Sequence, residues 1–106
     1  AGFELDRADK NLGTPENAVI LARSEKHSKK KFMLVPEEQL THITNWTGLP
    51  DEDLIRADMV YFATPSGGAV FSTGSITFCG SLPHNHFRNN ISKLLKNIFD
   101  RFLDVT

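Results

Sequence analysis

Apolar residues occur in four short runs, at 18–22, 32–35, 59–63 and 69–73. Each run holds about four or five residues and is bounded mainly by polar, glycine or proline residues, which is typical of buried strands. Pro36 would end the second run, because proline lacks the N–H that a β-ladder needs. We therefore predict a short mixed sheet, covered on both sides. The first two runs, separated by nine polar residues, could form a hairpin with an exposed tip.

The strongest turn signal lies between the third and fourth runs. Pro65 is followed by Ser66, Gly67 and Gly68, and such residues are typical of the turn in a β-hairpin. A phosphate-binding loop is the alternative. It is disfavoured, because no helix follows directly to focus amide groups on an anion.

The last segment has the period of an amphipathic α-helix over 91–103. Its polar residues fill the opposite face, so we expect the apolar stripe to pack on the sheet. Asn85 or Asn89 could cap the start of this helix. The stripe consists of Ile91, Leu94, Leu95, Ile98, Phe99, Phe102 and Leu103.

Two other segments lack a clear period. Residues 1–17 are rich in Asp, Asn, Gly and Pro, which favours irregular structure. Residues 41–58 are predicted to form a long surface segment with a few apolar anchors.

The composition limits the class of protein. A chain of 106 residues is one domain or part of one. A formal net charge of −1 disfavours nucleic acid and anionic membranes as partners, and no apolar run approaches the roughly 20 residues of a membrane span. Cys79 is the single cysteine, which suits a reducing compartment, so we expect a cytoplasmic protein. Because the chain opens with Ala1 rather than Met, we expect a piece of a longer protein.

His84 and His86 could chelate a metal from an extended backbone, but no third ligand follows at a familiar spacing. We therefore favour the interpretation that both histidines are simply polar residues at the start of a helix. Cys79 could be a nucleophile, yet the bulky Phe78 precedes it, so we favour a buried small thiol.

The glycine-rich loop at 74–81 leads toward the helix and could bind an anion. The alternative, which we favour, is that its glycines let chain segments pass closely. The lysines between 26 and 31 form a basic patch, for which a solvated loop is favoured over a nucleic-acid site, because interleaved aromatic residues are lacking.

Glu4 and Asp6 would share one face of an extended segment, opposite Phe3 and Leu5. Paired carboxylates can divide acid and base roles, although an exposed acidic edge is the default interpretation.

Several segments, taken together, resemble the C-terminal end of the N,N-dimethylformamidase large (beta) subunit family. The most specific of them, residues 64–72, includes the predicted hairpin turn. It lies within a longer match over residues 57–82, and the others are residues 2–9, 12–15 and 84–85. The matches keep their order along nearly the whole chain, with a weaker middle.

The resemblance implies a three-layer α/β fold like the class I glutamine amidotransferases, with residues 1–106 as the C-terminal part of a single such domain. It also implies an amide hydrolase that cleaves C–N bonds of small amides, with a mononuclear iron held by tyrosine and glutamate side chains upstream of this region. Glu4 matches a glutamate close to the active site of the family, and we expect it to orient substrate or transfer a proton. The implied partners are the remainder of the parent polypeptide or a companion subunit, and this chain alone should be inactive.

The sequence also departs from the family pattern. Phe78 stands where tryptophan is common, and Pro83 replaces a small polar residue, both of which suggest packing variation. Ala63 occupies a position that is often acidic, which implies an altered substrate or a member without formamidase activity. The alternative function is therefore a non-catalytic structural or carbohydrate-binding module, because fold does not dictate function.

Overall fold

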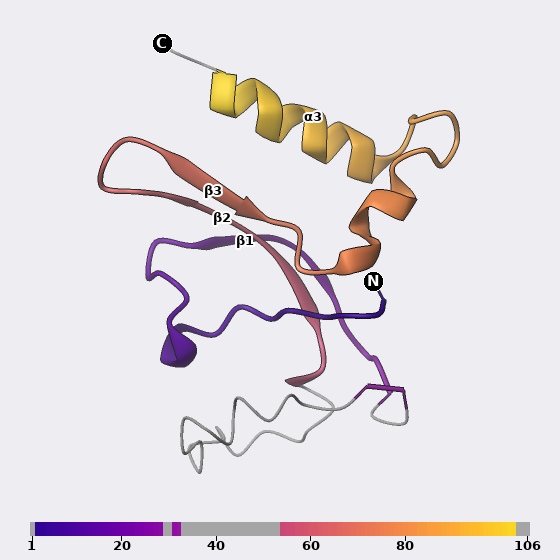
Figure 1. Ribbon diagram of the computed structural model, residues 1–106, viewed down its shortest axis with the longest axis horizontal. Helices are drawn as coiled ribbons and strands as arrows, with labels where there is room; N and C mark the ends of the chain where they lie inside the picture. Colours follow the sequence, from indigo (N-terminus) through magenta and orange to yellow (C-terminus); the bar gives the residue numbers. More distant parts are fainter. Residues whose placement is uncertain (1, 29–30, 33–53, 104–106) are drawn as a thin grey trace.

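The computed structural model describes residues 2–28, 31–32 and 54–103, which form a small sheet and one α-helix (Figure 1). In chain order the elements are the 3-10 helix η1 (Lys10–Leu12), the strands β1 (Val19–Ser24), β2 (Ala57–Ala63) and β3 (Ala69–Ser72), the 3-10 helix η2 (Ile76–Ser81) and the α-helix α3 (Asn90–Leu103).

Strand β2 is the centre of the sheet, and both β1 and β3 run antiparallel to it. Tyr61 pairs with Val19 on one side and with Phe71 on the other, while Leu21 is an extra residue that shifts the register of β1. The mixed sheet that we expected is therefore wrong for the described strands. A tight turn joins β2 to β3, and such a turn permits only antiparallel pairing.

The strand predictions are confirmed for the first, third and fourth runs, with ends shifted by a few residues. β1 pairs with β2, and the hairpin predicted between the first two runs stays a prediction, because Phe32 is the one described residue of the second run. Of the second run, Phe32 lies outside any strand, and residues 33–35 fall outside the described residues, as do Pro36 and 41–53.

The predicted burial of the first and fourth runs is wrong. Val19, Ile20 and Leu21 are 54%, 42% and 41% exposed, and Val70 is 40% exposed. Their strands are the two edges of the described sheet, so they have a neighbour on one side only. The apolar runs therefore indicated where strands form, but they did not indicate that both faces of the sheet are covered.

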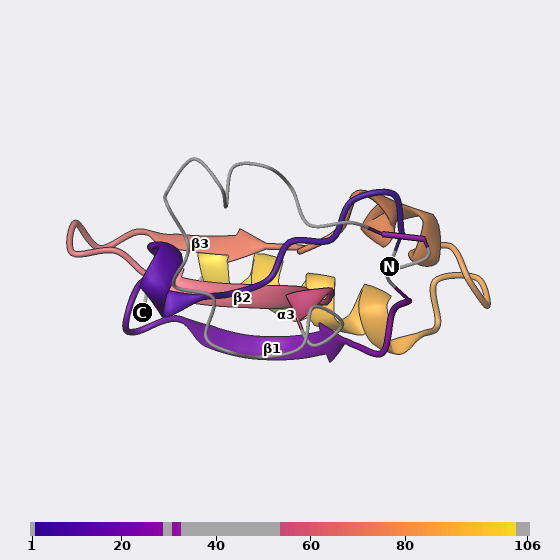
Figure 2. The ribbon, with the colours of Figure 1, turned by 90° about the horizontal axis from the view of Figure 1, so that it is seen from below.

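Helix α3 packs on one face of the sheet, as its apolar stripe predicted (Figure 2). Of the two possible caps it is Asn89 that acts, because its side-chain oxygen accepts from the Ser92 amide at 2.9 Å. Ile98 is buried, and the Phe102 ring stacks on Tyr61 at a centroid distance of 6.2 Å. The last turn is covered only in part, since Leu103 is 76% exposed. None of the described helices is long and apolar enough to cross a bilayer.

The segment before β1 lies on the opposite face of the sheet from α3 (Figures 1 and 2). Successive side chains of a strand point to opposite faces. In β2, Tyr61 contacts α3, whereas Asp58 bonds to Ala8 in the N-terminal segment. The buried side chains around these contacts come from β2, η2, α3 and the residues just before β2. They are Leu54, Ile55, Ala57, Val60, Phe78 and Ile98. The sheet therefore holds a helix on one side and the segment that carries Glu4 on the other.

Candidate functional site

Glu4 is the last residue of a tight three-residue turn. The Glu4 amide donates to the Gly2 carbonyl at 2.8 Å, which closes the turn around Phe3. Phe3 has φ 63°, a left-handed value that is unfavourable for a bulky residue. Its side chain is 89% exposed, and Glu4 is exposed as well. The extended backbone that would place Glu4 and Asp6 opposite Phe3 and Leu5 is therefore wrong at Phe3. We call residues 2–4 the Gly2–Glu4 turn.

Backbone hydrogen bonds tie the segment after this turn to the protein. The Asp6 amide donates to the Gly74 carbonyl at 2.8 Å, and the Asp58 amide donates to the Asp6 carbonyl at 2.9 Å. Leu5 also forms an isolated antiparallel bridge with Ser75. These contacts join the N-terminal segment both to β2 and to the loop between β3 and η2. The exposed carboxylate of Glu4 is thus carried by a segment with defined attachments.

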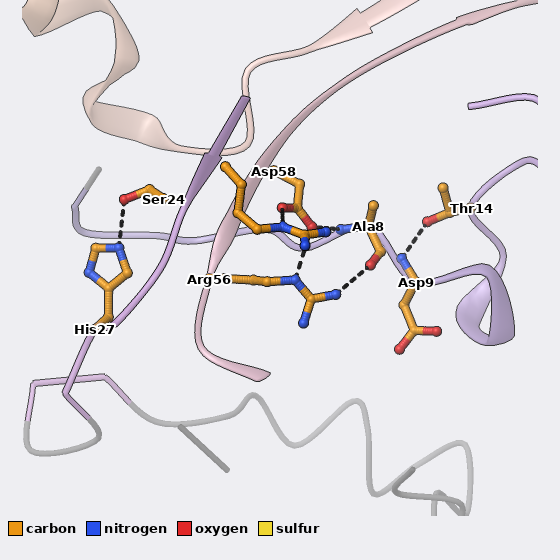
Figure 3. Close-up of polar contacts among 8 residues, drawn as sticks. Ala8, Asp9, Thr14, Ser24, His27, Arg56 and Asp58 are labelled. Atoms are coloured by element: carbon orange, nitrogen blue, oxygen red, sulfur yellow. Dashed lines mark hydrogen bonds and ion pairs between the residues drawn. The ribbon is translucent and has the colours of Figure 1, made fainter. Parts of the chain in front are cut away.

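The strongest attachment is the Asp58 cluster, formed by Asp58, Arg23, Arg56 and the backbone of Ala8 (Figure 3). Asp58 is 1% exposed. Arg23 Nε donates to one of its carboxylate oxygens at 2.6 Å, and Arg56 Nε donates to the other at 3.2 Å. The Ala8 amide donates to that second oxygen at 2.8 Å, while Arg56 donates to the Ala8 carbonyl at 2.9 Å. A buried carboxylate needs such partners, because burying an unpaired charge is costly.

The hydrogen bond to Asp58 raises the pKa of Arg23 above its ordinary value, against the opposing effect of partial burial. Arg23 therefore stays charged at every physiological pH. With Arg56 beside it, two cations face one carboxylate. Electrostatically the cluster is an anchor for the N-terminal segment, and both oxygens of its carboxylate accept hydrogen bonds.

Gly74 allows the close approach on which this anchor depends. It has φ 73°, and a Cβ atom at this position would lie 2.3 Å from the Asp58 carbonyl oxygen. Only glycine fits such a conformation and such a distance. The structural interpretation of the 74–81 loop, in which glycine lets two segments pass closely, is supported at this residue.

A cavity of about 220 Å³ adjoins the same region, between the sheet, η2 and the start of α3. Ala22, Met59 and Phe78 supply part of its apolar wall, and Ser75 and Thr77 also line it. This volume corresponds to several water molecules or one small organic molecule. The cavity thus reaches Ser75, which also bonds to the Gly2–Glu4 turn.

The other sequence candidates are not brought to this site. His84 and His86 are exposed, and the described part of the chain has no group of three or more His, Cys, Asp or Glu side chains that could hold a metal ion. Cys79 is exposed, so the buried thiol that we favoured is wrong. Its neighbour Phe78 faces the core, and with three residues per turn in η2 the next side chain points away from it. Residues 64–68 form the predicted hairpin turn, with the Thr64 amide donating to the Gly68 carbonyl at 2.8 Å.

The reasoning from sequence missed the Asp58 cluster. In the sequence Arg23 stands beside the predicted basic patch, and Arg56 and Asp58 fall within the predicted surface segment at 41–58. A signal was present, because Asp58 stands between Ala57 and the apolar residues of β2. A carboxylate inside such a run is either at a strand end or buried with partners.

Comparison with known proteins shows the family of the chain. The family described as "N,N-dimethylformamidase beta subunit-like, C-terminal" matches residues 1–90. The N,N-dimethylformamidase beta subunit of Alcaligenes sp is 40% identical over 102 residues, and that of Paracoccus aminophilus is 39% identical over the same length. Each match covers 96% of this chain, and the chain spans 13% of the length of each of these relatives. The chain belongs to the N,N-dimethylformamidase beta subunit-like, C-terminal family.

Proposed function

We propose that this chain is the closing part of a larger amide hydrolase, and that its contribution to the chemistry is the Glu4 carboxylate. The names of the two relatives support an enzyme that acts on a small amide. The observation that carries the proposal is the position of Glu4. It is exposed beside a strained turn, on a segment that a buried ion-pair cluster anchors. Strain of this kind is retained mainly where function requires it.

Glu4 has the chemistry that amide hydrolysis needs. Water must lose a proton as its oxygen bonds to the carbonyl carbon, and the nitrogen must gain a proton as the C–N bond breaks. A carboxylate within hydrogen-bond reach can accept the first proton and return it to the leaving amine. In this proposal Glu4 performs that transfer, or holds the substrate in the orientation that allows it.

Further parts of the proposal concern the whole protein. We propose that the complete domain has the three-layer fold of class I glutamine amidotransferases, of which α3 and the small sheet form the C-terminal part. The family resemblance implies iron, but the described residues offer no group of three or more His, Cys, Asp or Glu side chains that could hold it. Any iron would be held outside this part of the chain, and the role of Glu4 is proposed independently of it. The partners are then the rest of the polypeptide or a companion subunit, in the cytoplasm.

The test uses the full-length protein that carries this chain, with N,N-dimethylformamide as substrate and formate and dimethylamine measured as products. Glu4→Gln should lower kcat by about 100-fold or more, because general acid–base groups contribute on that scale. Glu16→Gln is the matched control. Its side chain is 87% exposed and pairs with Lys10, so kcat should stay within about twofold.

Two results would reject the proposal. Equal activity of Glu4→Gln and the parent protein would remove Glu4 from the chemistry. Absence of both turnover and bound metal in the full-length protein would instead support a non-catalytic structural or carbohydrate-binding module. Ala63 lies at the exposed end of β2 and departs from the family pattern. A second small amide should therefore be tested in the same assay.

A further inference from the structure

Ser75 is a buried polar residue whose side chain faces the Gly2–Glu4 turn. It is 8% exposed and has an extended backbone immediately before η2. The Gly2 amide donates to Ser75 Oγ at 3.0 Å, and Ser75 Oγ donates to the Gly2 carbonyl at 3.1 Å. One hydroxyl group therefore holds both backbone polar groups of the same residue.

The hydrogen-bonding capacity of this hydroxyl is fully used. A serine hydroxyl donates one proton and accepts up to two. Thr77 Oγ1 lies 3.2 Å from Ser75 Oγ. If Thr77 donates to Ser75, then Ser75 accepts from Thr77 and from the Gly2 amide and gives its own proton to the Gly2 carbonyl. Thr77 thus helps to direct the Ser75 proton toward the turn.

The Gly2 carbonyl is the atom through which Ser75 acts on Glu4. The same oxygen accepts the Glu4 amide at 2.8 Å and the Ser75 hydroxyl at 3.1 Å. The turn between them contains Phe3 with its left-handed φ. Such a conformation persists only where the surrounding structure enforces it. Ser75 enforces it before Phe3, and the Leu5 bridge to the Ser75 backbone enforces it after Phe3.

We propose that Ser75 is a positioning residue, whose hydroxyl holds the Gly2–Glu4 turn in its strained form and so sets the direction of the Glu4 carboxylate. This role rests on the function proposed for Glu4. Loss of the hydroxyl would let the turn relax, and the carboxylate would spend less time in reach of the reacting atoms. A displacement of about 1 Å is enough to slow catalysis by up to about 100-fold.

The matched control is Ser92, which also carries a partly buried hydroxyl. Ser92 Oγ donates to the Leu82 carbonyl at 2.6 Å, at the start of α3 and away from the turn. Ser92→Ala and Ser75→Ala therefore remove the same atom and a similar hydrogen bond. Only the Ser75 substitution removes a contact to the segment that carries Glu4.

The experiment compares both variants with Ser75→Thr in the full-length protein, using N,N-dimethylformamide hydrolysis. Ser75→Ala should lower kcat by about 10- to 100-fold with KM within about twofold, because it disturbs orientation and not substrate affinity. Ser75→Thr retains the hydroxyl and should restore kcat to within about threefold. Ser92→Ala should keep kcat within about twofold. Thr77→Val is a milder change and should give an intermediate loss of kcat. It replaces Ser75→Ala as the test if that variant does not fold.

Hydrogen exchange, followed by mass spectrometry in the same proteins, gives a readout that does not depend on turnover. Ser75→Ala should speed exchange of the amides at residues 2–4 by about tenfold, whereas Ser92→Ala should leave them unchanged. Unchanged exchange in Ser75→Ala, or a kcat equal to that of Ser92→Ala, overturns the role of Ser75. If the full-length protein without substitutions shows no turnover, but Ser75→Ala still speeds exchange at residues 2–4, the function proposed for Glu4 is rejected. The structural role of Ser75 then remains in place.

Discussion

Asp58→Asn should weaken the attachment of the N-terminal segment to the sheet. Asp58 is 1% exposed and receives three donors, namely Arg23 Nε, Arg56 Nε and the Ala8 amide. Asparagine keeps the shape of the side chain but has one acceptor oxygen and an NH₂ group, which is a donor. Whichever way the amide is turned, a donor would face a donor, and both guanidinium groups would lose the negative charge of Asp58.

The magnitude follows from the exposure of the partners. Breaking a buried ion pair by removing one partner costs about 3–5 kcal/mol. The Arg23 and Arg56 side chains are 36% and 17% exposed, so water can reach them and offset part of the loss. We therefore expect the lower end of that range, about 3 kcal/mol, as the loss in the free energy of opening the N-terminal segment.

Hydrogen exchange of the Ala8 amide, in the full-length protein, measures this local opening. At 1.4 kcal/mol per factor of ten, about 3 kcal/mol corresponds to roughly 100-fold faster exchange. Asp100→Asn is the control, because Asp100 pairs with Lys96 at 2.6 Å while both side chains stay more than half exposed. Such a surface pair contributes about 0.5 kcal/mol or less. If Asp58→Asn speeds exchange at Ala8 no more than about threefold, the buried cluster is not what anchors the segment.

Two further substitutions test the packing around the site. Gly74→Ala should destabilise by about 3 kcal/mol or more in urea unfolding, because its Cβ would meet the Asp58 backbone at 2.3 Å. Gly67→Ala, also at positive φ but with nothing within 4 Å, should cost only about 1 kcal/mol, and equal effects would contradict the close approach at Gly74. Phe102→Ala should cost about 1–2 kcal/mol and speed exchange in the last turn of α3, because the ring stacks on Tyr61 yet is 43% exposed. Unchanged exchange there would mean that the stack does not hold the helix end.

The elements that could be predicted from the sequence are those with local causes. The apolar stripe at 91–103 predicted the ends of α3 to within one residue. This was possible because the period and the length of a helix both depend on residues that are close together in the sequence. The turn at 64–68 likewise follows from adjacent proline and glycine residues. Strand positions were also predictable, but burial was not. Val19 and Ile20 are as apolar as core residues and are nevertheless exposed on an edge strand.

The candidate site could be predicted only in part. Glu4 was singled out because its surrounding residues resemble the family, and the structure adds the turn at Phe3 that no local pattern indicated. The extended backbone expected for this segment is interrupted at Phe3, whose left-handed φ lies before both Glu4 and Asp6. Cys79 was expected to be buried like Phe78, but the two face different ways from a 3-10 helix.

The amino-acid sequence by itself determined the family, the C-terminal helix and the hairpin, and it singled out Glu4 as a candidate, since each depends on residues close together in the chain or on an ordered series of motifs. The tertiary structure alone decided how Glu4 is held. Asp58 meets a residue 35 positions away and another 50 positions away, and Ser75 meets Gly2 across 73 positions. Contacts over such distances exist only after the chain has folded, because the packing of β2 and the loop before η2 against the N-terminal segment is what brings these groups within hydrogen-bond range.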